Sequence, residues 1–412
     1  MQKLTSRLPD HMADDFPKFA VMPLAKEKRR VVGSSVRDNR NTETGHLKDN
    51  EVTQSTAKTS AMVNIRDVAR ECGLSPTTVS MVLNHAPLAS YIPESTKKRI
   101  IQVAEGLGYQ PNPFAQSLRS HHSHTIGVMV PDIADPYCAQ ILRGIEDSFS
   151  RSNYLPFLVD IQNNGLRFKK YLNVLLGRRV EGLIILANSL SFETELLSAF
   201  ESRKIPSVIL GRESGTDALS WVATDNEAGT QQALEHLYRL GHRKIAFIRG
   251  PGMIVDSHHQ WAGICSFATA AGLELDPRLV VTLSDPFSSY EGGYERTKEL
   301  LTLKLPFSAL VAFDDMTAFG AIRALISAGL RVPLDCSVIG FDDIPAAAFY
   351  NPALTSVREH MEGMASMGAE ILMEAIRAHR KNTTVSPVRR KVKPKLIVRE
   401  STAAPSDFPR IP

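Results

Sequence analysis

The sequence has few cysteines, and none of them is paired with another at short spacing. The four are Cys72, Cys138, Cys265 and Cys336, and no C-x-x-C pair occurs. Zinc sites and disulfide frameworks both need cysteines at close or regular spacing, so neither is indicated. This cysteine usage is typical of a protein kept in the reducing cytoplasm.

Long apolar segments are also missing. No run of about 18 apolar residues occurs, which is the length that a membrane-spanning helix needs. Residues 1–30 lack a basic segment followed by an apolar core, so no secretory signal is indicated. The net charge of +4 is too small by itself to indicate a nucleic-acid partner. We therefore expect a cytoplasmic protein that has no membrane partner.

The motifs of common enzyme classes are absent from the sequence. There is no Walker loop and no H-E-x-x-H pair, and residues 211–215 do not form a G-x-S-x-G elbow because Ser214 is misplaced. An enzyme on a doubly wound scaffold would need a nucleophile, a base or a phosphate loop, and we find none. The sequence therefore predicts neither an enzyme nor a bound cofactor or metal.

The most informative stretch runs from Ile65 to Asn84. Its first part places four apolar residues on one face of a short helix, namely Ile65, Val68, Ala69 and Cys72. Gly73 ends that helix, Ser75 is placed to cap a second one, and Pro76 suits its first position. Two short helices joined by a tight turn have the proportions of a helix-turn-helix, although an ordinary helical hairpin would share the pattern. We expect the second helix to expose Thr77, Thr78, Ser80, Met81 and Asn84.

The segments before and after this stretch differ in composition and in hydrophobic pattern. Residues 1–61 are polar and unpatterned, which predicts a disordered extension, or a mis-annotated start if translation begins at Met62. Residues 62–111 would form the small all-α headpiece, with a third helix from about Glu94 to Leu107. Residues 112–124 would form a marginal hinge helix and a linker.

From residue 125 the sequence alternates between buried strand patterns and amphipathic helices. This alternation predicts an α/β core over residues 125–405, with two doubly wound parallel sheets in two lobes and a tail over 406–412. We expect the first lobe to hold about 125–223 and 352–382, and the second about 224–351 and 383–405. Ligands of such sheets bind beyond the carboxyl ends of the strands, so the default ligand site lies between the lobes.

From Asn64 to about Ala404 the sequence resembles the LacI/GalR family of transcriptional repressors. The resemblance rests on several runs in the family's order: T-V-S-x-V-L-N from Thr78, L-G-Y-x-P-N from Leu107, I-G-V-M-V-P-D-I from Ile126, L-G-H-R-K-I-A-F-I from Leu240, V-I-G-F-D-D from Val338 and P-A-L-T-S-V from Pro352. It implies a DNA-binding headpiece, a hinge helix that folds only on operator DNA, and a dimeric core of the periplasmic-binding-protein fold. It also implies a small effector, often a sugar or nucleoside, bound between the lobes.

The resemblance places the second helix of the headpiece in the major groove. Pro76 and Thr77 occupy positions that often select bases, and Met81 stands where the family usually has Arg, although Met81 could equally be a packing residue. Leu118 matches a leucine that enters the minor groove and kinks the DNA, with ordinary helix packing as the alternative. The expected DNA contacts are Ser75, Pro76, Thr77, Thr78, Ser80, Met81, Asn84, Asn112, Ala115, Leu118 and Arg119.

The expected effector site combines carboxylates for sugar hydroxyls with an aromatic face for the sugar ring. Asp342 and Asp314 follow strands and match the family's polar effector contacts, and we expect Asp315, rather than Asp314, to cap the following helix. Tyr137 and Phe287 are the best candidates for aromatic walls. Gln260 stands where the family usually has an effector-binding Arg, which disfavours an anionic effector and favours a neutral sugar or polyol.

The sequence thus predicts a homodimeric repressor that reads a pseudo-palindromic operator in double-stranded DNA under the control of a neutral, sugar-like effector. A rival interpretation is a sugar-binding transport-type protein without DNA function, which would share the core fold but not the helix-turn-helix. Part of this prediction rests on the expected similarity of fold to that family.

Overall fold

The computed structural model describes residues 63–84, 86–110, 122–187, 205–214, 217–284 and 289–406. Several sequence predictions lie outside these residues: the extension over 1–61, the hinge helix, a helix expected from Glu193 to Ser202, and Phe287. Within the described residues, no helix combines the length and the apolar character that crossing a bilayer requires.

The headpiece consists of three α-helices and a short 3₁₀ helix: α1 (Ile65–Cys72), α2 (Pro76–Leu83), η1 (Pro87–Tyr91) and α3 (Glu94–Gly106). The Asn64 side chain accepts a hydrogen bond from the backbone N–H of Arg66, and the Asp67 carboxylate accepts one from the backbone N–H of Asn64, which forms a capping box at α1. Gly73 ends α1 at φ 63°, a left-handed conformation that favours glycine. The Ser75 hydroxyl then caps α2 by accepting from the backbone N–H of Thr78 at 3.1 Å, as the sequence predicts.

The three helices enclose a small core. Arg99 on α3 also donates to the carbonyl of Cys72 at 3.0 Å, which joins α3 to the end of α1. Leu107, expected on the core face of the third helix, is instead 37% exposed because α3 ends at Gly106 and Leu107 lies in the turn that follows. The fully buried members of this core are Val68, Ala69, Cys72, Val79, Val82, Ile100 and Ala104.

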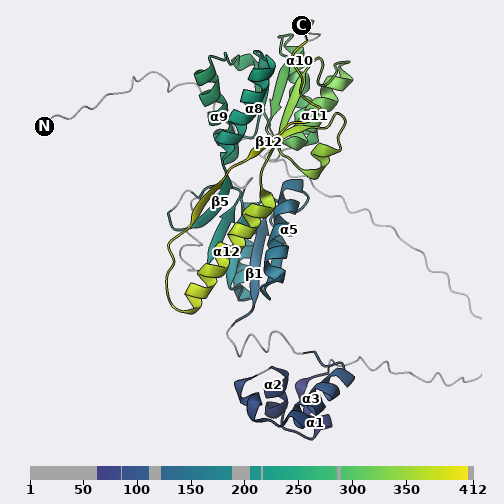
Figure 1. Ribbon diagram of the computed structural model, residues 1–412, viewed down its shortest axis with the longest axis vertical. Coiled ribbons are helices and arrows are strands. Elements are labelled where there is room, and N and C mark those ends of the chain that lie inside the picture. Colours follow the sequence, from purple (N-terminus) through teal and green to yellow (C-terminus); the bar gives the residue numbers. More distant parts are fainter. Residues whose placement is uncertain are drawn as a thin grey trace, which may run out of the picture. The chain divides into compact units, whose positions relative to one another are not determined.

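The core of the protein contains two six-stranded sheets (Figure 1). The first has the order β11-β5-β4-β3-β1-β2, and the second has the order β12-β10-β9-β8-β6-β7. All pairs are parallel except β10 with β12. Each sheet reverses its strand order beside one strand, β1 in the first and β6 in the second, and such switch points are where doubly wound sheets bind ligands.

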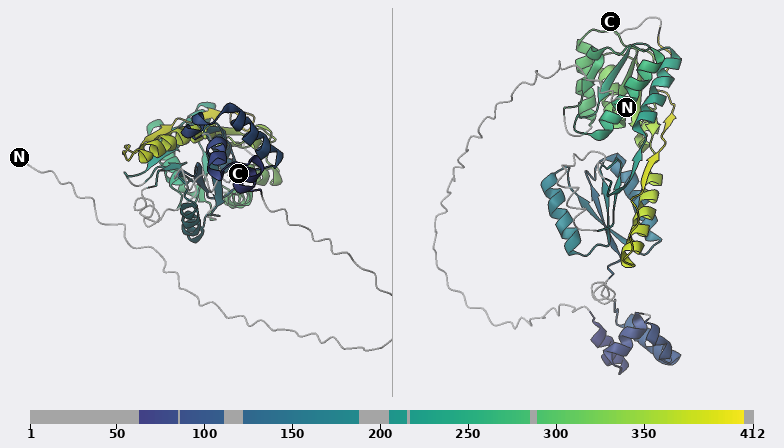
Figure 2. Two further views of the ribbon diagram at one scale, coloured as in Figure 1. Left: turned by 90° about the horizontal axis from the view of Figure 1, so that it is seen from below. Right: turned by 90° about the vertical axis from the view of Figure 1, so that its left-hand side faces the viewer.

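The first lobe is built on β1 (Thr125–Val130), β2 (Leu155–Asp160), β3 (Gly182–Leu186), β4 (Ser207–Leu210), β5 (Ser220–Thr224) and β11 (Arg389–Val392), with α5 (Pro136–Ser150), α6 (Gly165–Gly177) and α12 (Met361–Arg380). Alternate residues of its strands face opposite layers. Ile184 packs with α5 and α12, whereas Leu183 and Ile185 pack with α6. Helices therefore cover both faces of this sheet (Figure 2).

The second lobe is built on β6 (Ile245–Arg249), β7 (Val280–Thr282), β8 (Ala309–Ala312), β9 (Ser337–Asp342), β10 (Thr355–Arg358) and β12 (Lys395–Ile397), with α8 (Asn226–Leu240), α9 (Val255–Ala271), α10 (Tyr290–Thr302), α11 (Asp315–Ser327) and the 3₁₀ helices η2 (Pro277–Leu279) and η3 (Pro345–Ala348). Leu310 faces α10 and α11, whereas Ala309 and Val311 face α8 and α9. The two lobes thus share one architecture.

The chain crosses between the lobes after β5, after β10 and after β11, and we call these three places the crossing segments. Their positions correct the predicted lobe boundaries. Residues 355–358 pair with β9 and belong to the second sheet, although the sequence assigned them to the first lobe. Residues 389–392 pair with β5 in the first sheet, although the sequence assigned them to the second lobe. Strand pairing between segments far apart in the chain decides both points, and the sequence pattern does not encode it.

Candidate functional site

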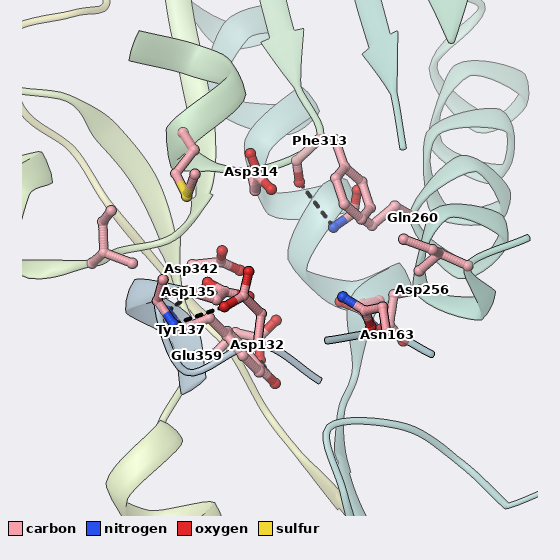
Figure 3. Close-up of a pocket in the computed structure, with 15 residues that line it drawn as sticks. Asp132, Asp135, Tyr137, Asn163, Asp256, Gln260, Phe313, Asp314, Asp342 and Glu359 are labelled. Carbon is pink, nitrogen blue, oxygen red and sulfur yellow. Dashed lines mark hydrogen bonds between the residues drawn. The ribbon is translucent and has the colours of Figure 1, made fainter. Parts of the chain in front are cut away.

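A cavity of about 190 Å³ lies between the two lobes (Figure 3). Every residue that lines it ends a strand or belongs to the segment that follows one, after β1, β2, β5, β6, β8, β9 or β10. This is the position at which doubly wound sheets bind ligands. The lining residues are Asp132, Ala134, Asp135, Tyr137, Asn163, Asn226, Ile254, Asp256, Gln260, Phe313, Asp314, Met316, Asp342, Ile344 and Glu359. We call this cavity the pocket.

Glu359, in the crossing segment after β10, joins elements of both lobes. Its Oε2 accepts hydrogen bonds from the hydroxyl of Thr224 at 2.7 Å and from the phenol of Tyr137 at 3.2 Å. Burial raises the pKa of Glu359 to about 7, although these two hydrogen bonds favour the carboxylate. Glu359 therefore connects the pocket to two crossing segments and can change its charge near neutral pH.

Asp342 ends β9 with φ at 100°, a backbone conformation rare for a residue other than glycine. Burial raises the pKa of Asp342 well above its ordinary value, and the charges of Glu359 and Asp314 add to this effect. Strained backbone and a perturbed carboxyl group both concentrate at functional sites. The pattern Gly-Phe-Asp-Asp thus places its first carboxyl group in the pocket, as expected from the sequence.

The structure moves the expected helix cap from Asp315 to its neighbour Asp314. Asp314 caps α11 by accepting from the backbone N–H of Thr317 at 2.8 Å, and it also lines the pocket. Asp315, expected to be the cap, is fully buried and accepts from Ser356 at 2.5 Å and from the backbone of Ile344 at 2.8 Å. Asp314 still has extended backbone, which an N-cap needs, whereas Asp315 is already the first helical residue.

Three residues of the second lobe form a polar wall of the pocket. Asp256 and Gln260 are four residues apart on α9, so they share one face of the helix. The Asn226 amide donates to Oδ1 of Asp256 at 3.1 Å, and the Gln260 amide donates to the carbonyl oxygen of Phe313 at 3.2 Å. Burial and the charge of Glu359 raise the pKa of Asp256, which the charge of Arg212 partly offsets. The side-chain oxygen of Asn226 is buried and has no hydrogen-bond partner within the described part of the chain.

Four of the five effector residues predicted from the sequence line the pocket together: Tyr137, Gln260, Asp314 and Asp342. The fifth, Phe287, lies outside the described residues. Sequence reasoning missed Asp132, Asp135, Asn163, Asn226, Asp256 and Glu359. Asp132 and Asp135 could have been found because they directly follow the first core strand, and Asp256 because it lies four residues before Gln260. Asn226 and Glu359 carry no comparable signal, because each follows a strand that the sequence pattern did not reveal.

The exposed surface of α2 differs from the prediction at one position. Ser75, Pro76, Thr77 and Asn84 are exposed, and Thr78 and Met81 are partly exposed. Ser80 is only 7% exposed, so it does not belong to the outer surface of the helix. The Asn84 amide donates to the Ser80 carbonyl at 2.8 Å and to the Ser80 hydroxyl at 3.0 Å. Ser80 is therefore a packing residue in this structure, and its expected exposure is wrong.

The remaining expected DNA contacts, Asn112, Ala115, Leu118 and Arg119, lie outside the described residues. The described part of the headpiece has another feature relevant to DNA. From Leu74 to Pro93 the chain contains no Asp, Glu, Lys or Arg. The outer surface of α2 therefore offers hydroxyl groups, methyl groups and a thioether, without a charged side chain.

Comparisons with known proteins agree with both sites. A family model described as "Bacterial regulatory proteins, lacI family" matches residues 64–112, and one described as "Periplasmic binding protein-like domain" matches residues 234–402. The HTH-type transcriptional repressor PurR of Haemophilus influenzae is 33% identical over 343 residues, which cover 82% of this chain and 98% of that protein.

Solved structures give the same result. The lac repressor dimer bound to operator and the anti-inducer ONPF superposes with a TM-score of 0.74 at 26% identity, covering 84% of this chain and 100% of that one. The transcriptional regulator CelR in complex with cellobiose superposes with a TM-score of 0.62 at 29% identity, covering 82% and 99% of the two chains. The match extends over the headpiece and both lobes, so the chain belongs to the LacI family of DNA-binding transcriptional regulators.

Proposed function

We propose that the protein is a repressor that binds a pseudo-palindromic operator as a homodimer and responds to a small polyhydroxylated effector without negative charge. The neutral sugar expected from Gln260 is the simplest member of this class. The observation that carries the proposal is the pocket, where carboxyl and amide groups from both lobes converge on one cavity. Such groups accept hydrogen bonds from adjacent hydroxyls of a sugar.

The effector class is supported by the lining of the pocket and by similar proteins. Asp342, Asp314 and Asp256 present carboxyl groups, and Phe313 supplies an aromatic ring beside them. Among the structures similar to this chain, that of CelR is a complex with cellobiose. An anionic effector would bring its charge close to these carboxyl groups, which costs free energy when no cation compensates it.

The effector can act on DNA binding by shifting the equilibrium between lobe arrangements. A ligand that contacts Asp342 of the second lobe and Asp132 or Asp135 of the first favours the arrangement that brings them together. Glu359 extends this coupling because it lies in a crossing segment and accepts a hydrogen bond from Thr224, the last residue of β5, directly before another crossing segment. A ligand shifts such an equilibrium by as much as its affinities for the two arrangements differ.

On the DNA side, we propose that Pro76, Thr77 and Met81 of α2 read the half-site in the major groove. Hydroxyl groups donate to or accept from base edges and phosphates, and methyl groups pack on thymine. The exposure of Thr77 and the partial exposure of Met81 support this role. The homodimer is supported by the similar lac repressor, whose structure is that of a dimer on its operator. Two headpieces related by a two-fold axis would match the two half-sites of a pseudo-palindrome.

The proposal is tested by selecting binding sites for the full-length protein from a random library of double-stranded DNA. We expect an enriched pseudo-palindrome, a protein mass in solution of two chains, and a change of operator affinity of at least tenfold with one sugar of a panel. Enrichment of no sequence would contradict the regulator and would favour a transport-type sugar-binding protein. An enriched operator whose binding no small molecule changes would contradict the effector control.

A further inference from the structure

The pocket contains more hydrogen-bond acceptors than donors. Six of its lining residues are carboxylic acids: Asp132, Asp135, Asp256, Asp314, Asp342 and Glu359. An ionised carboxylate accepts hydrogen bonds and donates none. A ligand that fits this lining must therefore supply most of the donors itself.

Three neutral polar side chains of the pocket reduce this imbalance only in part, because each uses a donor within the protein. The Tyr137 phenol donates to Glu359, the Asn226 amide donates to Asp256, and the Gln260 amide donates to the carbonyl of Phe313. Each of the two amides has a second N–H, but the acceptors of the lining still outnumber its donors. The pocket accordingly favours a ligand rich in donor groups.

One acceptor in the pocket lacks a partner altogether. Asn226 is 5% exposed, and its side-chain oxygen has no hydrogen-bond partner among the described residues. A buried polar atom without a partner costs about 1–3 kcal/mol. A hydrogen-bond donor on the ligand would remove this cost. Asn226 therefore favours a ligand with donor groups, independently of the carboxyl groups.

The charge of the lining has the same sign throughout. None of the described lining residues is Lys, Arg or His. The positive charge of Arg212 lowers the pKa of Asp256, whereas the negative charges of Glu359 and Glu213 raise it. At Asp342 the neighbouring charges of Glu359, Asp314, Asp315 and Asp135 are all negative. A positive charge in the pocket would be stabilised by carboxylates from both lobes.

We propose that the effector carries a protonated amine among its hydroxyl groups, as an amino sugar does, and that the amine lies among Asp256, Asp342 and Glu359. This inference rests on the proposed function and makes its effector class more specific. The sequence favoured a neutral effector because Gln260 replaces a cation. The fold then adds carboxyl groups that the sequence did not identify, and these favour a cation over a neutral ligand.

Binding of a cation should release protons. Burial raises the pKa of Glu359 to about 7, so part of this group is protonated at neutral pH, and burial also raises the pKa values of Asp256 and Asp342. A neighbouring ammonium group stabilises the carboxylate and lowers these pKa values. A neutral sugar would leave proton binding nearly unchanged, so proton release separates the two ligand classes.

The test is calorimetric titration of the full-length protein with matched sets of hexoses, each as the 2-amino sugar, its N-acetyl derivative, the parent sugar and the uronic acid. We expect one amino sugar to bind at least roughly tenfold more tightly than its N-acetyl and parent forms, since a charge-assisted hydrogen bond has about this effect. Titration in two buffers of different ionisation enthalpy should show net proton release with the amine alone. The same amino sugar should change operator binding.

Asp256→Asn tests the position of the amine while keeping the shape of the side chain and its contact with Asn226. We expect this variant to lose most of the preference for the amine and part of the proton release. The control Glu370→Gln, at an exposed position on α12, should retain both. Retention of the full preference and of the proton release in Asp256→Asn would contradict the proposed position.

The sugar titrations also distinguish a failure of the proposed amine from a failure of the proposed function. Equal or tighter binding of a parent or N-acetyl sugar that still changes operator affinity would overturn the amine and leave the sugar-controlled repressor standing. Binding of no sugar of any charge, with intact operator binding, would overturn both the amine and the proposed effector class.

Discussion

The outer surface of α2 and the lining of the pocket differ in charge and in origin. The chain from Leu74 to Pro93 contains no charged side chain of the Asp, Glu, Lys or Arg type, whereas six of the residues lining the pocket are carboxylic acids. The surface of α2 comes from one helix of eight residues, whereas the pocket collects residues from the ends of seven strands. The two sites are therefore built by different physical means.

The difference shows how each site can be changed. A site on one capped helix depends on that helix and on the small core beneath it, so a single substitution can remove the whole surface. A site assembled from many strand ends is held by two large cores, so a substitution there changes binding and leaves the fold in place. Four substitutions test this contrast.

Val79→Asp should have the largest effect, because Val79 is fully buried in the core of the headpiece. An unpaired carboxylate in this position is expected to cost about 4 kcal/mol or more, which a core of so few residues cannot offset. Specific operator affinity should fall to the level of random DNA in a fluorescence anisotropy titration. Effector binding and the main thermal transition should be retained, and their loss would contradict the independence of the two sites.

Glu359→Gln should change how stability depends on pH. Between its ordinary pKa of 4.5 and its folded value of about 7, the unfolded chain releases the Glu359 proton and the folded protein keeps it. Stability is therefore highest below this window and falls as pH rises through it, by at most about 3 kcal/mol. The variant has no proton to release, so its Tm should fall less over the same pH range.

The pH dependence of Tm is measured by circular dichroism of full-length protein. Gln can still accept from Thr224 and Tyr137 through its carbonyl oxygen, so the contacts between the crossing segments are kept. Glu370→Gln serves as the control for removing a carboxylate at an exposed position. Parallel pH profiles for the wild type and Glu359→Gln would show that Glu359 does not titrate in this window.

Asp342→Asn should weaken effector binding by about 2 kcal/mol, or roughly 30-fold, because it removes a charge-assisted hydrogen bond to the ligand. The measurement is a calorimetric titration with whichever effector changes operator affinity. Asp276→Asn, a partly exposed position in the second lobe that does not line the pocket, is the matched control. An unchanged affinity for Asp342→Asn would remove Asp342 from the effector site.

Thr77→Ala should have the smallest effect, about 1 kcal/mol or roughly fivefold, because one exposed hydroxyl and one methyl group are removed. The loss should appear with the selected operator and not with random DNA in the same anisotropy assay. Thr269→Ala, on α9 in the second lobe, should leave both affinities unchanged. Equal weakening on both DNAs would make Thr77 a phosphate contact and not a base contact.

Much of the fold could be predicted from the sequence. The alternation of strands and helices expected from residue 125 appears in the structure, and so do the helices expected in the headpiece. They are long apolar runs or well-capped helices, in which the local pattern and burial agree. The strands that sequence reasoning did not identify are β5, β10, β11 and β12, which are short and partly polar. Pairing with neighbours distant in the chain stabilises them, and single-sequence periodicity does not report this.

The candidate sites divide in the same way. Thr77 and Met81 are surface positions that the helical period of α2 identifies, whereas the expected exposure of Ser80 was wrong because Ser80 is buried and accepts from the Asn84 amide. In the pocket, Asp342 and Gln260 lie in local motifs and were identified. Asn226 and Glu359 could not be identified, because each becomes a pocket residue only when the crossing segments come together.

The order of most elements can be predicted from the sequence alone, and so can the capped recognition helix and the neutral side chain of Gln260. Each of these depends on residues close together in the chain. The tertiary structure alone decided the lobe boundaries, the cap at Asp314 and the six-carboxyl lining. Parallel strands place all their carboxyl ends at one edge of a sheet, and two such edges meet at the pocket. The acidity of the pocket is therefore a property of the assembled lobes, which no single stretch of the chain contains.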